Sequence, residues 1–165
     1  MSNHPAPAGP VFTPERRAEL DAMAAKYPTR QALLLPALWM AQHAHGWVSP
    51  EAIDEVAAEL GITPAYVRGV VTFYTMYHTH PVGRHFIQVC TTSPCLMCGS
   101  DAVVQALLEH TGCGELGATS PDGRFTVIET ECLGACGFVT PMLIDDDFLE
   151  SVTAEQVPDI LARYR

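Results

Sequence analysis

Four of the six cysteines in this sequence form two close pairs. Four residues separate Cys90 from Cys95, and three residues separate Cys132 from Cys136. Thiolates are soft ligands, and two such pairs brought together by a fold would make a four-sulfur cage. Such a cage suits either tetrahedral zinc or an iron–sulfur cluster. The spacing therefore predicts a metal centre, but it does not by itself separate zinc from a cluster.

Cys98 offers a competing ligand set. Together with Cys90 and Cys95 it spells Cys-x4-Cys-x2-Cys, the start of the plant-type ferredoxin spacing. That pattern needs a long loop around the cluster, whereas Cys98 immediately precedes a helical pattern. It also leaves at least one of Cys132 and Cys136 idle, and it does not explain why "ECLGAC", with its embedded glycine, resembles a second ligand turn. We therefore favour the two close pairs as ligands, and we interpret Cys98 and Cys113 as small buried hydrophobes with no metal role.

Two other chemistries receive less support from the sequence. Cys95 and Cys98 spell the CxxC of thiol-redox proteins, but two further cysteines would then have no purpose. His78, His80 and His85 lie close together, yet the sequence lacks the Cys-x-His pairs of a Rieske centre. It also lacks a GxGxxG or phosphate-cradling glycine loop, so we expect no nucleotide site on this chain.

Each cysteine pair follows a strand pattern. Residues 85–89 (HFIQV) and 124–130 (RFTVIET) are rich in β-branched and aromatic residues. Because both strands lead into a cysteine turn, we expect both pairs at the same end of a sheet. Residues 99–110 keep a helical period, residues 145–147 fit a hairpin turn, and Thr153 fits the capping box of a last helix.

The first half of the chain has helical patterns. Thr13, Ser49 and Thr63 each precede a proline, which is typical of a helix N-cap followed by proline at the first helical position. The helix expected after Thr63, over residues 64–77, is apolar around most of its circumference, so we expect it at the centre of the packing.

The order of these patterns predicts an α+β chain with two domains. A flexible N-terminus over residues 1–12 precedes a helical bundle over residues 13–81. A small α/β domain over residues 82–165 then carries all six cysteines.

Composition limits the environment and the partners. The formal net charge is −10 with a single lysine, which excludes a phosphate-binding surface for nucleic acid. No apolar run reaches the roughly 20 residues needed to span a bilayer, and no secretory signal is recognisable. We expect a cytoplasmic protein whose thiols stay reduced and free to bind metal.

Four segments resemble one family. These are "LLPALWMAQHAHGWV", "GITPAYVRGVVTFYTMY", "VCTTSPCLMCGSDAV" and "ECLGACGFVTPMLIDDDF". In this order they resemble the E-type subunits of NADH:quinone oxidoreductase, respiratory complex I, from about Phe12 to Leu161. Thr140, where alanine is frequent, and Asp145, where asparagine is common, depart from the family pattern.

The resemblance implies both fold and function. It implies a helical bundle followed by a thioredoxin-like domain that holds one [2Fe-2S] cluster. The ligands that it implies by matching motif are Cys90, Cys95, Cys132 and Cys136. It also implies that the cluster exchanges single electrons with the FMN of a partner subunit that binds NADH, so FMN and NADH would lie only on that partner. The complex would place this chain at the inner face of the cell membrane without a span of its own.

Two alternatives remain open on the sequence. The chain could be the equivalent subunit of the diaphorase module in an NAD-linked hydrogenase or formate dehydrogenase. In a different class, it could be a structural zinc module that mediates assembly. Both alternatives keep the two cysteine pairs as ligands.

Overall fold

The computed structural model of the chain describes residues 9–164. Most of the expected flexible N-terminus, residues 1–8, lies outside this range. The predicted flexible segment also included Val11 and Phe12, but these two residues are buried in the core of the helices. The backbone N–H of Val11 donates to Glu55 Oε2 at 2.9 Å, which fixes the segment before Thr13. The core of the helical unit therefore begins ahead of its first helix.

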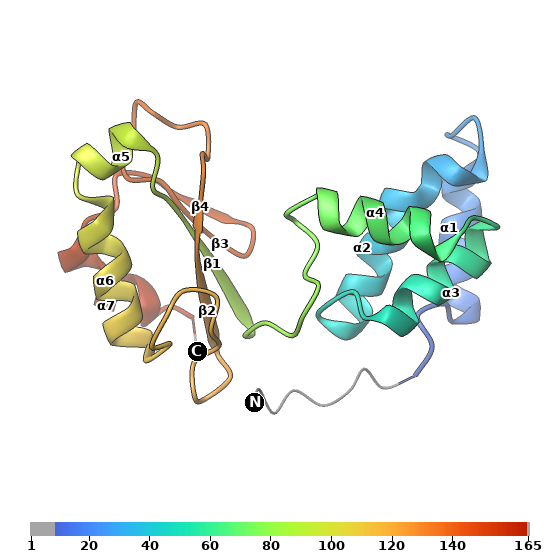
Figure 1. Cartoon of the computed structure of the whole chain (residues 1–165), viewed down its shortest axis with the longest axis horizontal. Helices are drawn as coiled ribbons and strands as arrows, with labels where there is room; N and C mark the ends of the chain where they lie inside the picture. Colours follow the sequence, from blue (N-terminus) through green and yellow to red (C-terminus); the bar gives the residue numbers. More distant parts are fainter. Residues whose placement is uncertain (1–8, 165) are drawn as a thin grey trace. The chain divides into compact units, whose positions relative to one another are not determined.

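The described residues form two compact units, and the boundary in the chain lies between Pro81 and Val82. The first unit is helical. Its elements are α1 (Pro14–Ala24), the 3-10 helix η1 (Arg30–Leu33), α2 (Leu34–His45), α3 (Pro50–Leu60) and α4 (Pro64–Phe73) (Figure 1). None of the helices in the described part of the chain is long and apolar enough to cross a membrane.

The three predicted proline-assisted helix starts are confirmed. The Ser49 side chain accepts a hydrogen bond from the backbone N–H of Ala52 at 3.1 Å. Thr13 and Thr63 accept equivalent bonds at the starts of α1 and α4. In each case the side-chain oxygen satisfies a backbone donor that has no partner within the helix.

The predicted central position of the helix after Thr63 is wrong. Helix α4 ends at Phe73, and only Val67 and Val71 on it are buried. Tyr66 is half exposed and the Phe73 side chain is 75% exposed. The core of this unit is instead built mainly on one face each of α2 and α3. Apolar composition alone could not reveal that α4 packs through a narrow stripe.

The second unit is a four-stranded sheet with helices on one face. Its strands are β1 (His85–Cys90), β2 (Phe125–Thr130), β3 (Met142–Ile144) and β4 (Asp147–Leu149). Its helical elements are α5 (Ser93–Met97), α6 (Ser100–Thr111), the 3-10 helix η2 (Ala154–Gln156) and α7 (Val157–Leu161). The strand order is β2-β1-β3-β4, with β1 and β2 parallel and the other pairs antiparallel.

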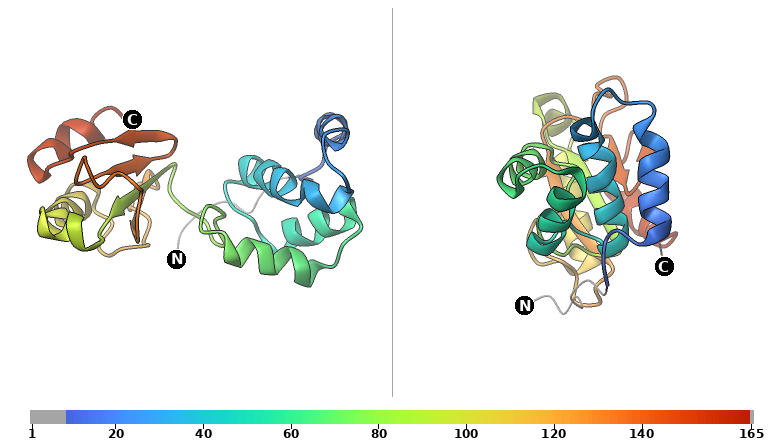
Figure 2. Two further views of the ribbon diagram at one scale, coloured as in Figure 1. Left: turned by 90° about the horizontal axis from the view of Figure 1, so that it is seen from above. Right: turned by 90° about the vertical axis from the view of Figure 1, so that its right-hand side faces the viewer.

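Helices α6 and α7 lie on the same face of this sheet (Figures 1 and 2). Alternate strand residues such as Ile87, Val89 and Val127 are fully buried, and they pack in one core with Leu107 of α6 and Ile160 of α7. The Thr153–Gln156 capping box and the β3–β4 hairpin are present as predicted. A helical unit followed by a mixed α/β unit confirms the predicted fold class.

Candidate metal centre

The parallel pairing of β1 and β2 brings the two cysteine pairs to one edge of the sheet. Cys90 is the last residue of β1 and lies opposite Thr130, the last residue of β2. Cys132 follows two residues after Thr130. Helix α5, which carries Cys95, lies at the same end of the sheet as the segment after β2 (Figure 1). The prediction that both pairs lie at the same end of a sheet is confirmed.

Cys90 and Cys95 form a buried, close pair. Their sulfur atoms are 3.4 Å apart, and the Cys95 thiol donates to Cys90 Sγ. Burial raises the pKa of Cys90, but hydrogen bonds from the Thr92 side chain and from the backbone of Thr92 and Leu133 outweigh it and lower the pKa to about 7. The Cys90 thiol is therefore about half ionised at neutral pH, and its thiolate accepts the hydrogen bond of the Cys95 thiol.

Cys95 has the opposite shift. Burial raises its pKa most, and the hydrogen bond to Cys90 and the charges of Cys90, Cys136 and Cys132 add to this, so that the pKa reaches about 11. A thiolate at Cys95 would lie within electrostatic reach of three others. Such a concentration of sulfur charge is what a bound cation or cationic cluster core would neutralise.

Cys132 and Cys136 lie on the exposed segment that follows β2. The backbone N–H of Gly134 donates to Cys132 Sγ at 3.3 Å, as expected for a thiolate ligand turn. In the described part of the chain, no three His, Cys, Asp or Glu side chains lie close enough together to hold a metal ion. The structure therefore brings the two pairs to one edge and joins Cys90 to Cys95, but it does not gather three or more of the four cysteines closely enough to hold a metal ion. The four-cysteine ligand set stays a prediction.

The two remaining cysteines differ from each other. Cys113 is buried, and its Sγ lies 3.5 Å from the Phe125 carbonyl oxygen, so its interpretation as a small buried side chain holds. Cys98 is exposed, and its interpretation as a buried hydrophobe is wrong. The reason is helix α5, a short turn that the sequence pattern did not predict. It places Cys95 inward, whereas Cys98, the residue after its last turn, faces solvent. Pro94 in the first turn of α5 was the available signal.

The donor set fits an iron–sulfur cluster. A cluster needs soft, ionised sulfur ligands with N–H donors beside them. This site offers four cysteine thiols, the Gly134 N–H beside Cys132, and a Cys90 thiol whose pKa is lowered to about 7.

Thr140, four residues after Cys136, adds a further sign. Its Oγ1 is buried and has no hydrogen-bond partner among the described residues. Buried side-chain atoms of His45, His85 and Ser100 are also without a partner among the described residues, and of the four residues only Thr140 lies on the segment that carries Cys132 and Cys136. A further group at the site would satisfy its hydroxyl.

Gly134 provides a test of the second ligand turn. Its φ is +74°, a left-handed conformation, although the space around it is open. We expect Gly134→Ala to lower the free energy of unfolding of the metal-free protein by about 1 kcal/mol, because an L-residue is strained there. The expected second effect is faster loss of the cluster to an iron chelator, because the strained turn no longer holds its N–H on Cys132.

The matched control for this test is Gly137→Ala. Gly137 lies in the same segment and in open space, but it has no left-handed φ. Its alanine variant is expected to unfold within about 0.5 kcal/mol of wild type. Urea denaturation measures both changes, and equal stability of the two variants would rule out a conformational role for Gly134.

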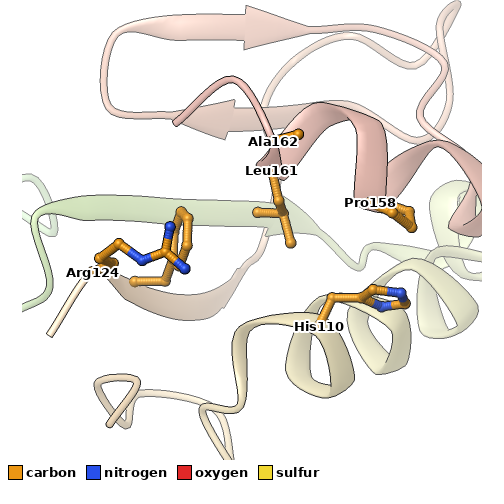
Figure 3. A pocket seen from close by; sticks show the side chains of 6 residues that line it. His110, Arg124, Pro158, Leu161 and Ala162 are labelled. Carbon is orange, nitrogen blue, oxygen red and sulfur yellow. The ribbon is translucent and has the colours of Figure 1, made fainter. Parts of the chain in front are cut away.

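A separate hollow lies on the helix-covered side of the sheet (Figure 3). Its volume is about 220 Å³, and its lining includes His110 on α6, Arg124 before β2 and Leu161 on α7. The Arg124 guanidinium donates to Asp122 at 2.6 Å, and His110 Nδ1 lies 2.8 Å from the Ala106 carbonyl oxygen. Both polar side chains are thus already engaged, and no cysteine lines this hollow.

Comparison with known proteins identifies the family. Residues 20–165 match the family of thioredoxin-like [2Fe-2S] ferredoxins. The chain is 41% identical over 153 residues to the mitochondrial NADH dehydrogenase (ubiquinone) flavoprotein 2 of Dictyostelium discoideum, a match that covers 91% of this chain and 62% of that protein. It is 36% identical over 157 residues to NADH-quinone oxidoreductase subunit 2 of Thermus thermophilus, covering 93% of this chain and 86% of that protein.

A solved structure shares the fold. An NAD+-reducing [NiFe]-hydrogenase in its air-oxidised state aligns with a TM-score of 0.70 at 20% identity, over 80% of this chain and 22% of that chain. At this identity the likeness concerns the fold alone. The family match and the two relatives confirm the resemblance found in the four sequence segments. This chain belongs to the family of thioredoxin-like [2Fe-2S] ferredoxins.

Proposed function

We propose that this chain is the electron-transfer subunit of an NADH–quinone oxidoreductase, and that Cys90, Cys95, Cys132 and Cys136 hold its single [2Fe-2S] cluster. The observation that carries the proposal is the parallel pairing of β1 and β2, which ends both strands at one edge beside the two cysteine pairs. When bound, such a cluster supplies one-electron transfer.

The protein's own residues prepare the site. Cys90 ionises with a pKa of about 7, so little free energy is needed to present it as a thiolate at neutral pH. Cys95 must release the proton that it shares with Cys90, and cluster assembly is therefore coupled to loss of that proton. The backbone N–H of Gly134 offsets negative charge on Cys132.

We further propose that the partner is a subunit that binds FMN and NADH, and that the hydride chemistry takes place there. The names of the relatives support an NADH-linked complex. Within such a complex, this chain would lie at the inner face of the cell membrane. The hydrogenase alternative has a likeness of fold in its favour, at 20% identity, whereas the NADH-dehydrogenase relatives are 41% and 36% identical in sequence.

Electron transfer to the partner tests this function directly. The cluster in the purified chain is reduced with dithionite, freed of excess reductant, and mixed anaerobically with the oxidised FMN-binding subunit. We expect the absorbance of the oxidised cluster to return as flavin absorbance falls, with one electron counted per chain. Stoichiometric zinc, with no iron, sulfide or visible absorbance, would instead establish the structural zinc alternative.

A further inference from the structure

Large apolar side chains are exposed on the two segments that carry the cysteines. Leu96 and Met97 directly follow Cys95, and Phe138 lies two residues after Cys136. Their exposures are 53%, 88% and 52%. None of the three belongs to the hydrophobic core of the sheet unit. We call these three residues the cluster-side apolar surface.

Their grouping distinguishes them from scattered surface hydrophobes. Helix α5 and the segment after β2 are remote in sequence, yet they lie at the same end of the sheet (Figure 1). Single exposed apolar residues are common and need no explanation, whereas several at one functional edge indicate an interaction site. Water-exposed apolar groups beside a redox centre are stabilised when a second protein covers them.

The charges around this surface have one sign. Between Arg84 and Arg124, and again between Arg124 and Arg163, the sequence contains no lysine or arginine. The N–H of Ser151 donates to the Phe138 carbonyl at 3.0 Å, so the segment that follows β4 joins the surface directly. Exposed carboxylates occur on the elements that flank the ligand segments. They are Asp101 on α6, Glu129 and Glu131 at and after the end of β2, and Glu150 after β4. The rim of the cluster-side apolar surface is therefore acidic.

We propose that Leu96, Met97 and Phe138 form the docking surface for the redox partner, and that the partner's complementary face is apolar at its centre and basic at its rim. This inference rests on the proposed electron-transfer function. Electron exchange requires the partner's cofactor to come close to the cluster, and these residues border the ligands. A second copy of this chain would oppose acid to acid at a net charge of −10 each, and an anionic membrane would be repelled in the same way.

The test compares variants of the cluster-loaded full chain for binding to the purified FMN-binding subunit. In Met97→Asp and Phe138→Asp a charge replaces an apolar contact, and Met97→Gln provides a milder, neutral change. The matched control is Leu116→Asp. Leu116 is 37% exposed in the same unit, but it lies in the segment between α6 and β2 and on neither ligand segment. Iron content and the EPR signal after dithionite reduction verify that each variant keeps its cluster.

We expect the dissociation constant to rise about tenfold or more for both aspartate variants and less for Met97→Gln, as for residues at the centre of an interface. The Leu116 variant should stay within about twofold of wild type. Wild-type affinity should also weaken as salt is raised from low to physiological concentration, because the acidic rim pairs with basic groups. Unchanged affinity in the ligand-segment variants, or a loss confined to Leu116→Asp, would overturn the proposed surface. Salt-independent binding would overturn the basic rim.

The two proposals fail differently in this experiment. If the wild-type complex forms but no electron passes between cluster and FMN, the proposed function is wrong while the docking surface is still measured by binding. If electrons pass and the Met97 and Phe138 variants bind and react like wild type, the function stands and the surface is wrong. Absence of any wild-type binding would contradict both the partner and the surface.

Discussion

Serine at any one of the four proposed ligand positions is expected to abolish the [2Fe-2S] cluster, whereas serine at Cys98 or Cys113 is expected to leave it intact. Each ligand supplies one of four thiolates, and a hydroxyl is a poor substitute for a soft sulfur ligand. Cys98 faces solvent beyond the last turn of α5, and Cys113 lies against the Phe125 carbonyl within the core. Neither residue belongs to the two close pairs.

The readout is iron and acid-labile sulfide per chain, together with the EPR signal of the reduced protein. Cys95→Ser gives the sharpest result, because Cys95 is buried against Cys90 at 3.4 Å and loss of its sulfur removes the hydrogen-bond donor to the thiol whose pKa is lowered to about 7. Cys98→Ser is its matched control on the same short segment. Cluster loss in Cys98→Ser, combined with retention in the Cys132 or Cys136 variant, would restore the plant-type ligand set.

Local patterns explain what the sequence predicted well. A hydroxyl before a proline fixes a helix start through contacts a few residues apart, so the starts after Thr13, Ser49 and Thr63 could be recognised directly. The two strands before the cysteine turns were recognised for a similar reason, since their side-chain type is a local property. Their parallel pairing then placed both cysteine pairs at one edge.

Non-local contacts explain what the sequence did not reveal. Helix α4 is rich in apolar residues, but which of them are buried depends on how it meets the other helices of its unit. Because Phe73 is exposed, the apolar composition of α4 predicted a more central helix than the structure contains. Cys98 was misplaced because the five-residue helix α5 is too short to show a periodic pattern. The exposure of Met97, the residue before Cys98, was not predicted for the same reason. This exposure supports the proposed docking surface.

Gly83→Ala is expected to destabilise the sheet unit more than Gly134→Ala or Gly137→Ala. A Cβ atom at this position would lie 2.6 Å from the Phe125 carbonyl carbon and 2.8 Å from the Phe125 nitrogen. Both are main-chain atoms that cannot rotate away, and Phe125 is itself buried in the core. The two segments would have to separate, at a cost of about 3 kcal/mol or more in the free energy of unfolding.

The consequence should reach the far end of the sheet. The Gly83 N–H donates to Thr126 Oγ1 at 2.8 Å, and the His85 N–H donates to the Arg124 carbonyl at 2.7 Å. These contacts at the start of β1 set the register of its pairing with β2. The same register places Cys90 opposite the last residue of β2. Urea denaturation should therefore show a lower midpoint for Gly83→Ala, and the variant should assemble less cluster under limiting iron. Gly137→Ala, which adds the same methyl group in open space, should do neither. If both variants behave like wild type, the close approach at Gly83 does not position the metal centre, and the register must be held by the strand hydrogen bonds and the core packing alone.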